Sequence, residues 1–194
     1  MILPGKTALA KNILSHGIVN RATQVQPCGI DLTLKRVLTF TSSGSVDFDN
    51  SQRKLADTTI IPFQPSPALT TTTTTAATAS DASVTDTSIP ETREPGFIDL
   101  PAGAYLVEFN EKLGMPLDAM GELYVRSSLF RSGALLSGGV MDSGYHGALG
   151  ALLQVINPYG LRLWRDARLG QMVVHEMAEK TDGYQGMYQG KVEM

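Results

Sequence analysis

Residues 30–40, Ile-Asp-Leu-Thr-Leu-Lys-Arg-Val-Leu-Thr-Phe, alternate in places between apolar and polar side chains. Alternation with a period of two is typical of a strand with one buried face. Similar stretches follow at residues 104–109, 121–125, 151–156 and 171–177. The 19 glycines and 10 prolines are spread between these short runs, as in an antiparallel barrel or sandwich and unlike a βαβ repeat. We therefore expect an all-β fold.

One short helical pattern stands out near the start of the chain. Residues 7–14, Thr-Ala-Leu-Ala-Lys-Asn-Ile-Leu, favour a helix, and Gly17 is placed to end it. The expected fold is therefore all-β with a short N-terminal helix.

The segment from about residue 65 to residue 94 has a different composition. Thr70 to Thr75 are unbroken, and the rest is Ala, Ser, Thr and Asp with almost no large apolar side chain. Such a stretch buries too little surface to offset the entropy lost on ordering. We expect a disordered spacer inserted in a single domain that spans residues 1–194; a phosphorylated or partner-binding segment is the alternative.

Composition excludes several classes of function. A formal net charge of −3 does not suit a protein that binds nucleic acid or a membrane surface. Cys28 is the only cysteine, so an internal disulfide and a Cys-rich zinc site are excluded, and three histidines make a histidine metal triad a poor expectation. No apolar run approaches the roughly 20 residues that span a bilayer, and the N-terminus lacks a signal-peptide core. We expect an intracellular, cytoplasmic protein, with a nuclear location left open.

Four compact polar stretches have candidate chemistry. Each one alone also fits an ordinary turn, because Asp, Ser and Gly commonly build turns and Arg commonly lies on surface loops. The four stretches are Gln26-Pro-Cys-Gly-Ile-Asp-Leu, Val125-Arg-Ser-Ser-Leu-Phe-Arg-Ser-Gly, Gly138-Gly-Val-Met-Asp-Ser-Gly-Tyr-His-Gly and Asp166-Ala-Arg-Leu-Gly-Gln-Met-Val.

Taken together and in this order, the stretches resemble the motifs of the trimeric dUTPase and dCTP deaminase superfamily, and most closely its archaeal-type dUTPase branch. The likeness covers nearly the whole chain except the Thr-rich insert. It implies a distorted, jelly-roll-like β-barrel, a homotrimer with sites at the subunit interfaces, and hydrolysis of dUTP to dUMP and pyrophosphate. The residues that carry it are 1–6, 24–34, 47–50, 109–111, 126–131, 142–147, 157–160, 167–171 and 184–190.

The resemblance implies that water attacks the α-phosphorus of dUTP. Asp142 matches the general base of the family, and Arg126 and Ser127 match its phosphate-contacting pair. A guanidinium offers a fork of donors that suits phosphate oxygens. Ser128 and Arg131 would extend these substrate contacts, although Ser128 stands where Gly is usual in other dUTPases.

Mg²⁺ is the cofactor that the resemblance implies. In this family the triphosphate and water molecules largely hold the ion, so few protein ligands are expected. Asp31 is the candidate for an outer-shell contact with the ion. The alternative, that Asp31 only pins its strand, carries equal weight.

The nucleoside is expected to lie against the third stretch. Tyr145 matches the aromatic residue that packs on the deoxyribose and leaves no room for a 2′-hydroxyl. Backbone groups of the hairpin would recognise the base. The hairpin residues are Ser137, Gly138, Gly139, Val140 and Met141.

Two further elements complete the implied site. Arg168 and Gln171 would contact phosphates or support the site from a neighbouring subunit. A C-terminal arm, at about residues 181–194, would close over the nucleotide with Tyr184, Tyr188 and Gln189. A frayed tail is the alternative, and the repeated Tyr-Gln-Gly favours the arm.

Two other functions are alternatives to dUTP hydrolysis. A dCTP deaminase shares most of these motifs, but it needs a glutamate that shuttles protons on the strand after the third motif. Counting from either side puts Leu152 or Gln154 at that position, and neither is a carboxylate. A non-catalytic nucleotide-binding module is disfavoured because Asp142, Arg126 and Gln171 are all present.

Overall fold

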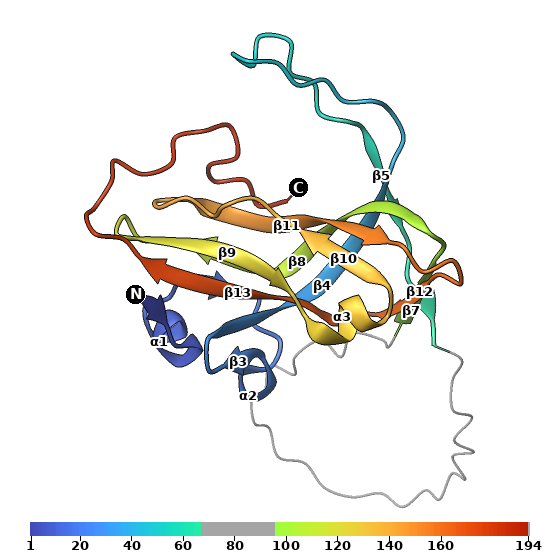
Figure 1. The fold of residues 1–194 in the computed structure, drawn as a ribbon, viewed down its shortest axis with the longest axis horizontal. Coiled ribbons are helices and arrows are strands. Elements are labelled where there is room, and N and C mark those ends of the chain that lie inside the picture. Colours follow the sequence, from blue (N-terminus) through green and yellow to red (C-terminus); the bar gives the residue numbers. More distant parts are fainter. Residues whose placement is uncertain (67–95, 194) are drawn as a thin grey trace, which may run out of the picture.

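The computed structural model describes residues 1–66 and 96–193 (Figure 1). Three short helices occur in these ranges: α1 (Gly5–Ala10), α2 (Arg21–Gln24) and α3 (Ser127–Arg131). The strands are β1 (Ile2–Leu3), β2 (Leu14–His16), β3 (Val25–Gln26), β4 (Gly29–Phe40), β5 (Thr58–Ile61), β6 (Gln64–Pro65), β7 (Gly96–Leu100), β8 (Gly103–Gly114), β9 (Ala119–Val125), β10 (Ala134–Ser137), β11 (His146–Val155), β12 (Leu161–Trp164) and β13 (Arg168–Glu176).

A curled antiparallel sheet of ten strands forms the body of the described chain (Figure 1). Its main path runs β1-β13-β4-β8-β11-β10, while β2, β3, β5 and β9 pair with members of that path. A smaller sheet has the order β12-β7-β6. The expected all-β fold with a short N-terminal helix is confirmed.

The long strand β4 lies between β13 and β8 and is buried on both faces over its first half. Ile30, Leu32 and Leu34 are buried in the hydrophobic core. The polar Asp31 and Thr33 on the opposite face are buried as well. This second face is therefore a buried polar layer, and it lies directly behind one part of the candidate site.

The expected helix at residues 7–14 is shifted. The helix begins at Gly5 and ends at Ala10, and Asn12 then takes a left-handed conformation with φ 54°. Leu14 belongs to β2, which pairs with β8. Gly17 does not end the helix: it lies against the Asn110 carbonyl, where a side chain would clash. Pairing with the edge of β8 overrides the local helical preference of this segment.

The five expected strands are confirmed, several of them longer than expected. The strand expected at 104–109 continues to Gly114 as β8, and the one expected at 151–156 begins at His146 as β11. Alternation failed beyond Phe109 because Asn110 and Glu111 are polar. Their side chains nevertheless lie in a buried or partly buried hydrogen-bond network, which the sequence pattern could not indicate.

Two other features frame the site. The segment between β4 and β5 extends away from the body of the sheet (Figure 1). The Thr-rich insert expected at 65–94 lies outside the described residues except for Pro65 and Ser66. Within the described ranges, no helix has the length and apolar character needed to cross a bilayer.

Candidate active site

Strand pairing brings three of the four polar stretches together. Strand β13 pairs with β4 on one side and with β9 on the other, and Gln171 lies opposite both Asp31 and Tyr124. Arg126 follows the end of β9, and Arg168 begins β13. We call Asp31, Arg126 and Arg168 the arginine cluster.

The Asp31 carboxylate joins the two guanidinium groups. Its Oδ2 lies 3.1 Å from Arg126 Nε and 3.1 Å from Arg168 Nη1, and the side chain is 1% exposed. Burial raises the pKa of Asp31, while the charges of Arg126 and Arg168 oppose that rise. The two arginine side chains are 26% and 35% exposed, so each guanidinium has one side held by protein and another open to an anion.

Backbone carbonyls fix the same two arginines. Arg126 Nη1 donates to the Arg168 carbonyl at 3.3 Å, and Arg168 Nη1 donates to the Thr23 carbonyl at 2.6 Å. The guanidinium orientation is therefore set by β4, β13 and the short helix α2 together.

The remaining residues expected at the phosphates lie around this cluster. Ser127, Ser128 and Arg131 are exposed on α3, directly after Arg126. Within the described parts of the chain, no carboxylate forms an ion pair with Arg131, whose guanidinium lies 5.8 Å from the Phe130 ring centroid. Gln171 is half-buried, and its Nε2 lies close to Gly29, where the Met172 carbonyl leaves no room for a side chain.

A second group of expected residues lines a separate cavity, which we call the hairpin pocket. Its volume is about 640 Å³. The turn between β10 and β11, the C-terminal arm and the base of the segment between β4 and β5 form its walls. The residues expected from the sequence that line it are Gly138, Gly139, Val140, Met141, Asp142, Tyr145, Tyr184 and Tyr188.

Asp142 stands at the edge of a tight turn in this pocket. The backbone of the preceding Met141 pairs with Gly121 on β9, and the Asp142 carbonyl accepts from Tyr145 N at 3.2 Å. The carboxylate is exposed and, among the described residues, has no hydrogen-bond or ion-pair partner. An aspartate that only capped its turn would accept a backbone N–H. The Asp142 carboxylate is instead available to a ligand in the pocket.

Tyr145 is held on two sides. Its hydroxyl donates to the Ala148 carbonyl at 2.8 Å, and its ring meets the Tyr184 ring edge-on, with centroids 5.5 Å apart. Burial raises the pKa of Tyr145, and Tyr184 adds to that rise. The ring is thus a fixed, uncharged wall of the pocket.

The glycine pair of the hairpin provides space, since neither residue has a positive φ. A side chain at position 138 would press on Leu123, whereas one at position 139 would meet no atom within 4 Å. Ser137 ends β10 and is exposed, and Val140 is exposed as well. The backbone at Gly139 is therefore open to a ligand.

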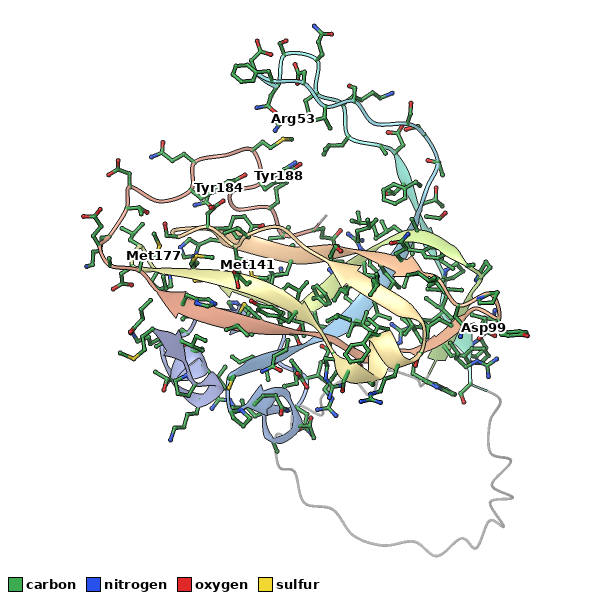
Figure 2. The ribbon with its side chains drawn as sticks, in the orientation of Figure 1. Arg53, Asp99, Met141, Met177, Tyr184 and Tyr188 are labelled. Carbon is green, nitrogen blue, oxygen red and sulfur yellow. The ribbon has the colours of Figure 1, made fainter. Side chains whose placement is uncertain are left out.

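The C-terminal arm lies along the hairpin of its own chain. Tyr184 N donates to the Ser143 carbonyl at 2.7 Å, and Gly190 N donates to the His146 carbonyl at 2.8 Å. Gln189 Nε2 donates to the Gly144 carbonyl at 2.9 Å, so this residue holds the turn and does not line the pocket. Tyr184 and Tyr188 lie on the same side of the sheet as Arg53 of the projecting segment (Figure 2).

The arginine cluster and the hairpin pocket are separate within one chain. Gly121 of β9 pairs with Met141 beside the pocket, while Arg126 follows the far end of the same strand. Five residues at about 3.4 Å each place these points about 17 Å apart. The residues expected to form one site therefore fall into two groups.

Several contacts were not expected from the sequence. Phe40, Leu55, Ala56, Thr58, Lys191 and Glu193 also line the hairpin pocket. They come from distant segments without a shared pattern, and no sequence signal links them. Gln24 and Glu111 belong to stretches that carried the family resemblance, but their place in the buried network beside the arginine cluster depends on the fold.

Comparison with known proteins shows which sequences the chain resembles. Residues 2–177 match the family model for dCTP deaminase-like proteins. The chain is 35% identical over 179 residues to a Methanosarcina mazei protein named "Probable deoxyuridine 5'-triphosphate nucleotidohydrolase", covering 92% of this chain and 88% of that one. It is 30% identical over 168 residues to the Methanocaldococcus jannaschii "Deoxyuridine 5'-triphosphate nucleotidohydrolase", covering 87% and 88% of the two chains.

Among solved structures, the fold is similar to that of 2'-deoxycytidine 5'-triphosphate deaminase from Agrobacterium tumefaciens. The TM-score is 0.56 at 18% identity, over 90% of this chain and 48% of the longer deaminase chain. At that identity the likeness concerns the fold alone.

Proposed function

Because the chain belongs to the dCTP deaminase-like family, we propose that it is a dUTP diphosphatase, which hydrolyses dUTP to dUMP and pyrophosphate. Two relatives at 30–35% identity are named for this activity. Within the chain, one observation carries the proposal. An exposed, unpartnered carboxylate, Asp142, lines the same pocket as an open hairpin backbone and three tyrosines.

Asp142 is the proposed general base. Water attacks the α-phosphorus, its oxygen forms the new bond, and the bond to the bridging oxygen of the leaving pyrophosphate breaks. A carboxylate without a protein partner can orient that water and accept its proton. The exposed position of Asp142 in the pocket supports this role.

The nucleoside is proposed to occupy the hairpin pocket. The Tyr145 ring, fixed by its hydroxyl and by Tyr184, would pack on the deoxyribose and leave no space for a 2′-hydroxyl. The open backbone at residues 138–141 would bind the base through N–H and C=O groups. Closure of the arm over the ligand would exclude water.

The arginine cluster, Ser127 and Gln171 are proposed to bind the polyphosphate. A separation of about 17 Å along β9 exceeds what one arginine side chain spans. This separation supports a site in which a second copy of the chain brings its cluster to the hairpin pocket of the first. In a homotrimer with three such shared sites, every copy contributes one arginine cluster and one hairpin pocket.

The proposed cofactor is Mg²⁺. No three His, Cys, Asp or Glu residues in the described ranges are grouped so that they could hold a metal by themselves. This donor set fits an ion held mainly by phosphate oxygens and water, which is common for Mg²⁺. Asp31 would contribute the protein's share through water. When bound, the ion would neutralise charge on the phosphates.

Deamination of dCTP is the weaker alternative. The two positions at which a proton-shuttling glutamate would stand, Leu152 and Gln154, are both exposed on β11 and line no part of the hairpin pocket. Neither side chain can take up and return a proton.

The proposal is tested by pyrophosphate release from dUTP, dCTP, dTTP and UTP, with and without Mg²⁺. We expect Mg²⁺-dependent release from dUTP, and a loss of about 10²- to 10⁴-fold in turnover for Asp142→Asn. Asp182→Asn, an exposed arm residue outside the pocket, is the matched control and should keep full turnover. Well-folded protein that releases no pyrophosphate from any of the four nucleotides would overturn the proposal.

A further inference from the structure

A buried polar network lies directly behind the arginine cluster. Gln24, Asp31, Thr33 and Glu111 are all almost completely buried. Burying polar groups is costly unless each one finds hydrogen-bond partners. The proposed reaction uses none of Gln24, Thr33 and Glu111 directly, so their joint burial calls for another explanation.

Glu111 is fully enclosed by donors. Its carboxylate accepts from Gln24 Nε2 at 2.6 Å, from Thr33 N at 2.9 Å and from Thr33 Oγ1 at 2.6 Å. Burial raises the pKa of Glu111, and these hydrogen bonds counter that rise. All three of these hydrogen bonds are donated to the carboxylate, so this position uses an acceptor.

Gln24 carries the contact from Glu111 to the cluster. Its Oε1 accepts from Val19 N and Asn20 N, both at 2.8 Å, which fixes the start of α2. Its Nε2 also donates to the Asp31 carbonyl at 2.9 Å. The neighbouring Thr23 supplies the carbonyl that accepts from Arg168.

Asn110 supports the same arginine from the other side. Its Nδ2 donates to Thr33 Oγ1 at 3.0 Å and to Asp166 Oδ1 at 2.7 Å. Asp166 takes a left-handed conformation, φ 60°, two residues before Arg168. The pair Asn110-Glu111 thus contacts both the strand that carries Asp31 and the turn that leads into Arg168.

We propose that Glu111 is a positioning residue which, acting through Gln24 and Thr33, fixes Asp31 and the Thr23 carbonyl and so orients the guanidinium groups of Arg126 and Arg168 toward a polyphosphate. The inference deepens the proposed function, since it assigns the polyphosphate to this cluster. It predicts that the network affects binding of the phosphate chain and leaves nucleoside binding alone.

Glu111→Gln is the informative change. A glutamine keeps the shape of the side chain but replaces one acceptor oxygen with an NH₂ group. Gln24 Nε2 and Thr33 N can only donate, and they bind different oxygens of the carboxylate, so that NH₂ must face one of them. Facing Gln24, the NH₂ displaces the side chain that supports the Asp31 backbone and α2. Facing Thr33 N, it breaks the contact with β4 two residues after Asp31.

Glu108→Gln is the matched control. Glu108 lies on the same strand, is also 1% exposed, and pairs with Lys35 at 2.7 Å and Arg36 at 2.6 Å. Lys35 and Arg36 both lie outside the arginine cluster. Glu108→Gln therefore also changes a buried carboxylate of β8 and lowers stability, but it does not disturb Gln24.

The experiment measures binding to the full-length protein by titration calorimetry, with inorganic tripolyphosphate plus Mg²⁺ and, separately, deoxyuridine. We expect Glu111→Gln to weaken tripolyphosphate binding about tenfold, because a hydrogen bond to a charged group is lost. Deoxyuridine binding should stay unchanged, and Glu108→Gln should match wild type for both ligands. Equal tripolyphosphate affinity in Glu111→Gln and wild type, or an equal loss in both variants, would overturn the inference.

Two further measurements keep the outcome decisive. If Glu111→Gln does not fold, Thr33→Val is measured instead in the same assay. It removes one donor to Glu111 and should weaken tripolyphosphate binding about threefold, and unchanged binding would overturn the inference.

Hydrolysis of dUTP by wild type is measured in parallel. A wild type that hydrolyses dUTP but binds tripolyphosphate no better than Glu111→Gln refutes the positioning role alone. Tripolyphosphate binding that is weakened as expected, without any hydrolysis, supports the positioning role and refutes the diphosphatase.

Discussion

The arginine cluster and the hairpin pocket are built in opposite ways. Asp31 is buried, and its two arginines are held by the strands β4 and β13, the helix α2 and a network that reaches Glu111. Asp142 is exposed on a turn with open glycine backbone, and the nearby walls include an arm held by a few hydrogen bonds near the end of the chain.

This contrast matches the ligand groups that the two regions are proposed to bind. A polyphosphate needs fixed positive charge, and fixing a guanidinium requires buried partners. A nucleoside must enter and leave, which suits a pocket whose walls include an arm that is proposed to close over the ligand. The two regions lie apart within one chain, in keeping with the proposal that complete sites form between copies.

Mixing two inactive variants tests that separation and has the largest expected effect. Asp142→Asn and Arg126→Ala should each lose about 10²-fold or more in turnover. Unfolded together in equal amounts and refolded, they should recover about one quarter of wild-type turnover. In a symmetric trimer, about one site in four then joins an intact Asp142 to an intact Arg126 from another copy. Recovery no greater than either variant alone would place both groups of residues in one chain.

Removing a tyrosine of the C-terminal arm tests the hairpin pocket. Tyr188→Ala should raise the KM for dUTP about 2- to 10-fold, because one aromatic wall of the hairpin pocket is lost. The matched control is Tyr159→Ala, which removes an exposed tyrosine far from the pocket lining. An equal KM for the two variants would mean that the arm does not contact bound nucleotide.

A pH titration of stability tests the buried side. Burial raises the pKa of Glu111 above its ordinary 4.5 in the folded protein. The folded state therefore holds this proton more tightly, and the resulting stabilisation is complete below pH 4.5 and is lost as the pH rises through the raised value.

Glu111→Gln removes this titration. The difference in melting temperature, wild type minus variant, should therefore fall as the pH rises above about 4.5. We expect a change of a few degrees, since about 1 kcal/mol corresponds to about 2–4 °C in a chain of this size. A difference that stays flat or grows over that range would show that Glu111 is not the buried acid described here.

Deleting the Thr-rich insert has the smallest expected effect. Pro65 and Gly96 are cross-strand partners in β6 and β7, so a short turn can replace residues 67–95. If the insert is a spacer, turnover of dUTP should stay within about twofold of wild type. A large loss of turnover, with the melting temperature unchanged, would give the insert a functional role.

Local pattern was sufficient for much of the fold. Alternation in residues 30–40 identified the strand that became β4, and glycine and proline spacing indicated antiparallel β-structure. The order of the polar motifs indicated the family, now supported by a match over residues 2–177. These features are encoded within short windows, where side-chain period and turn chemistry act directly.

Long-range pairing decided the rest. The local helical preference predicted a helix that ends at Leu14. In the structure the helix ends at Ala10, because Leu14 belongs to a strand that pairs with β8. The polar residues after Phe109 predicted the end of a strand there. Glu111 instead finds hydrogen-bond partners far along the chain, and strand β8 continues to Gly114. The meeting of Asp31 with Arg126 and Arg168, about 100 residues away or more, depends on the register of β13 between β4 and β9. Strand β9 also keeps Asp142 apart from the arginines, because it runs from Gly121, beside the pocket, to Val125, just before Arg126.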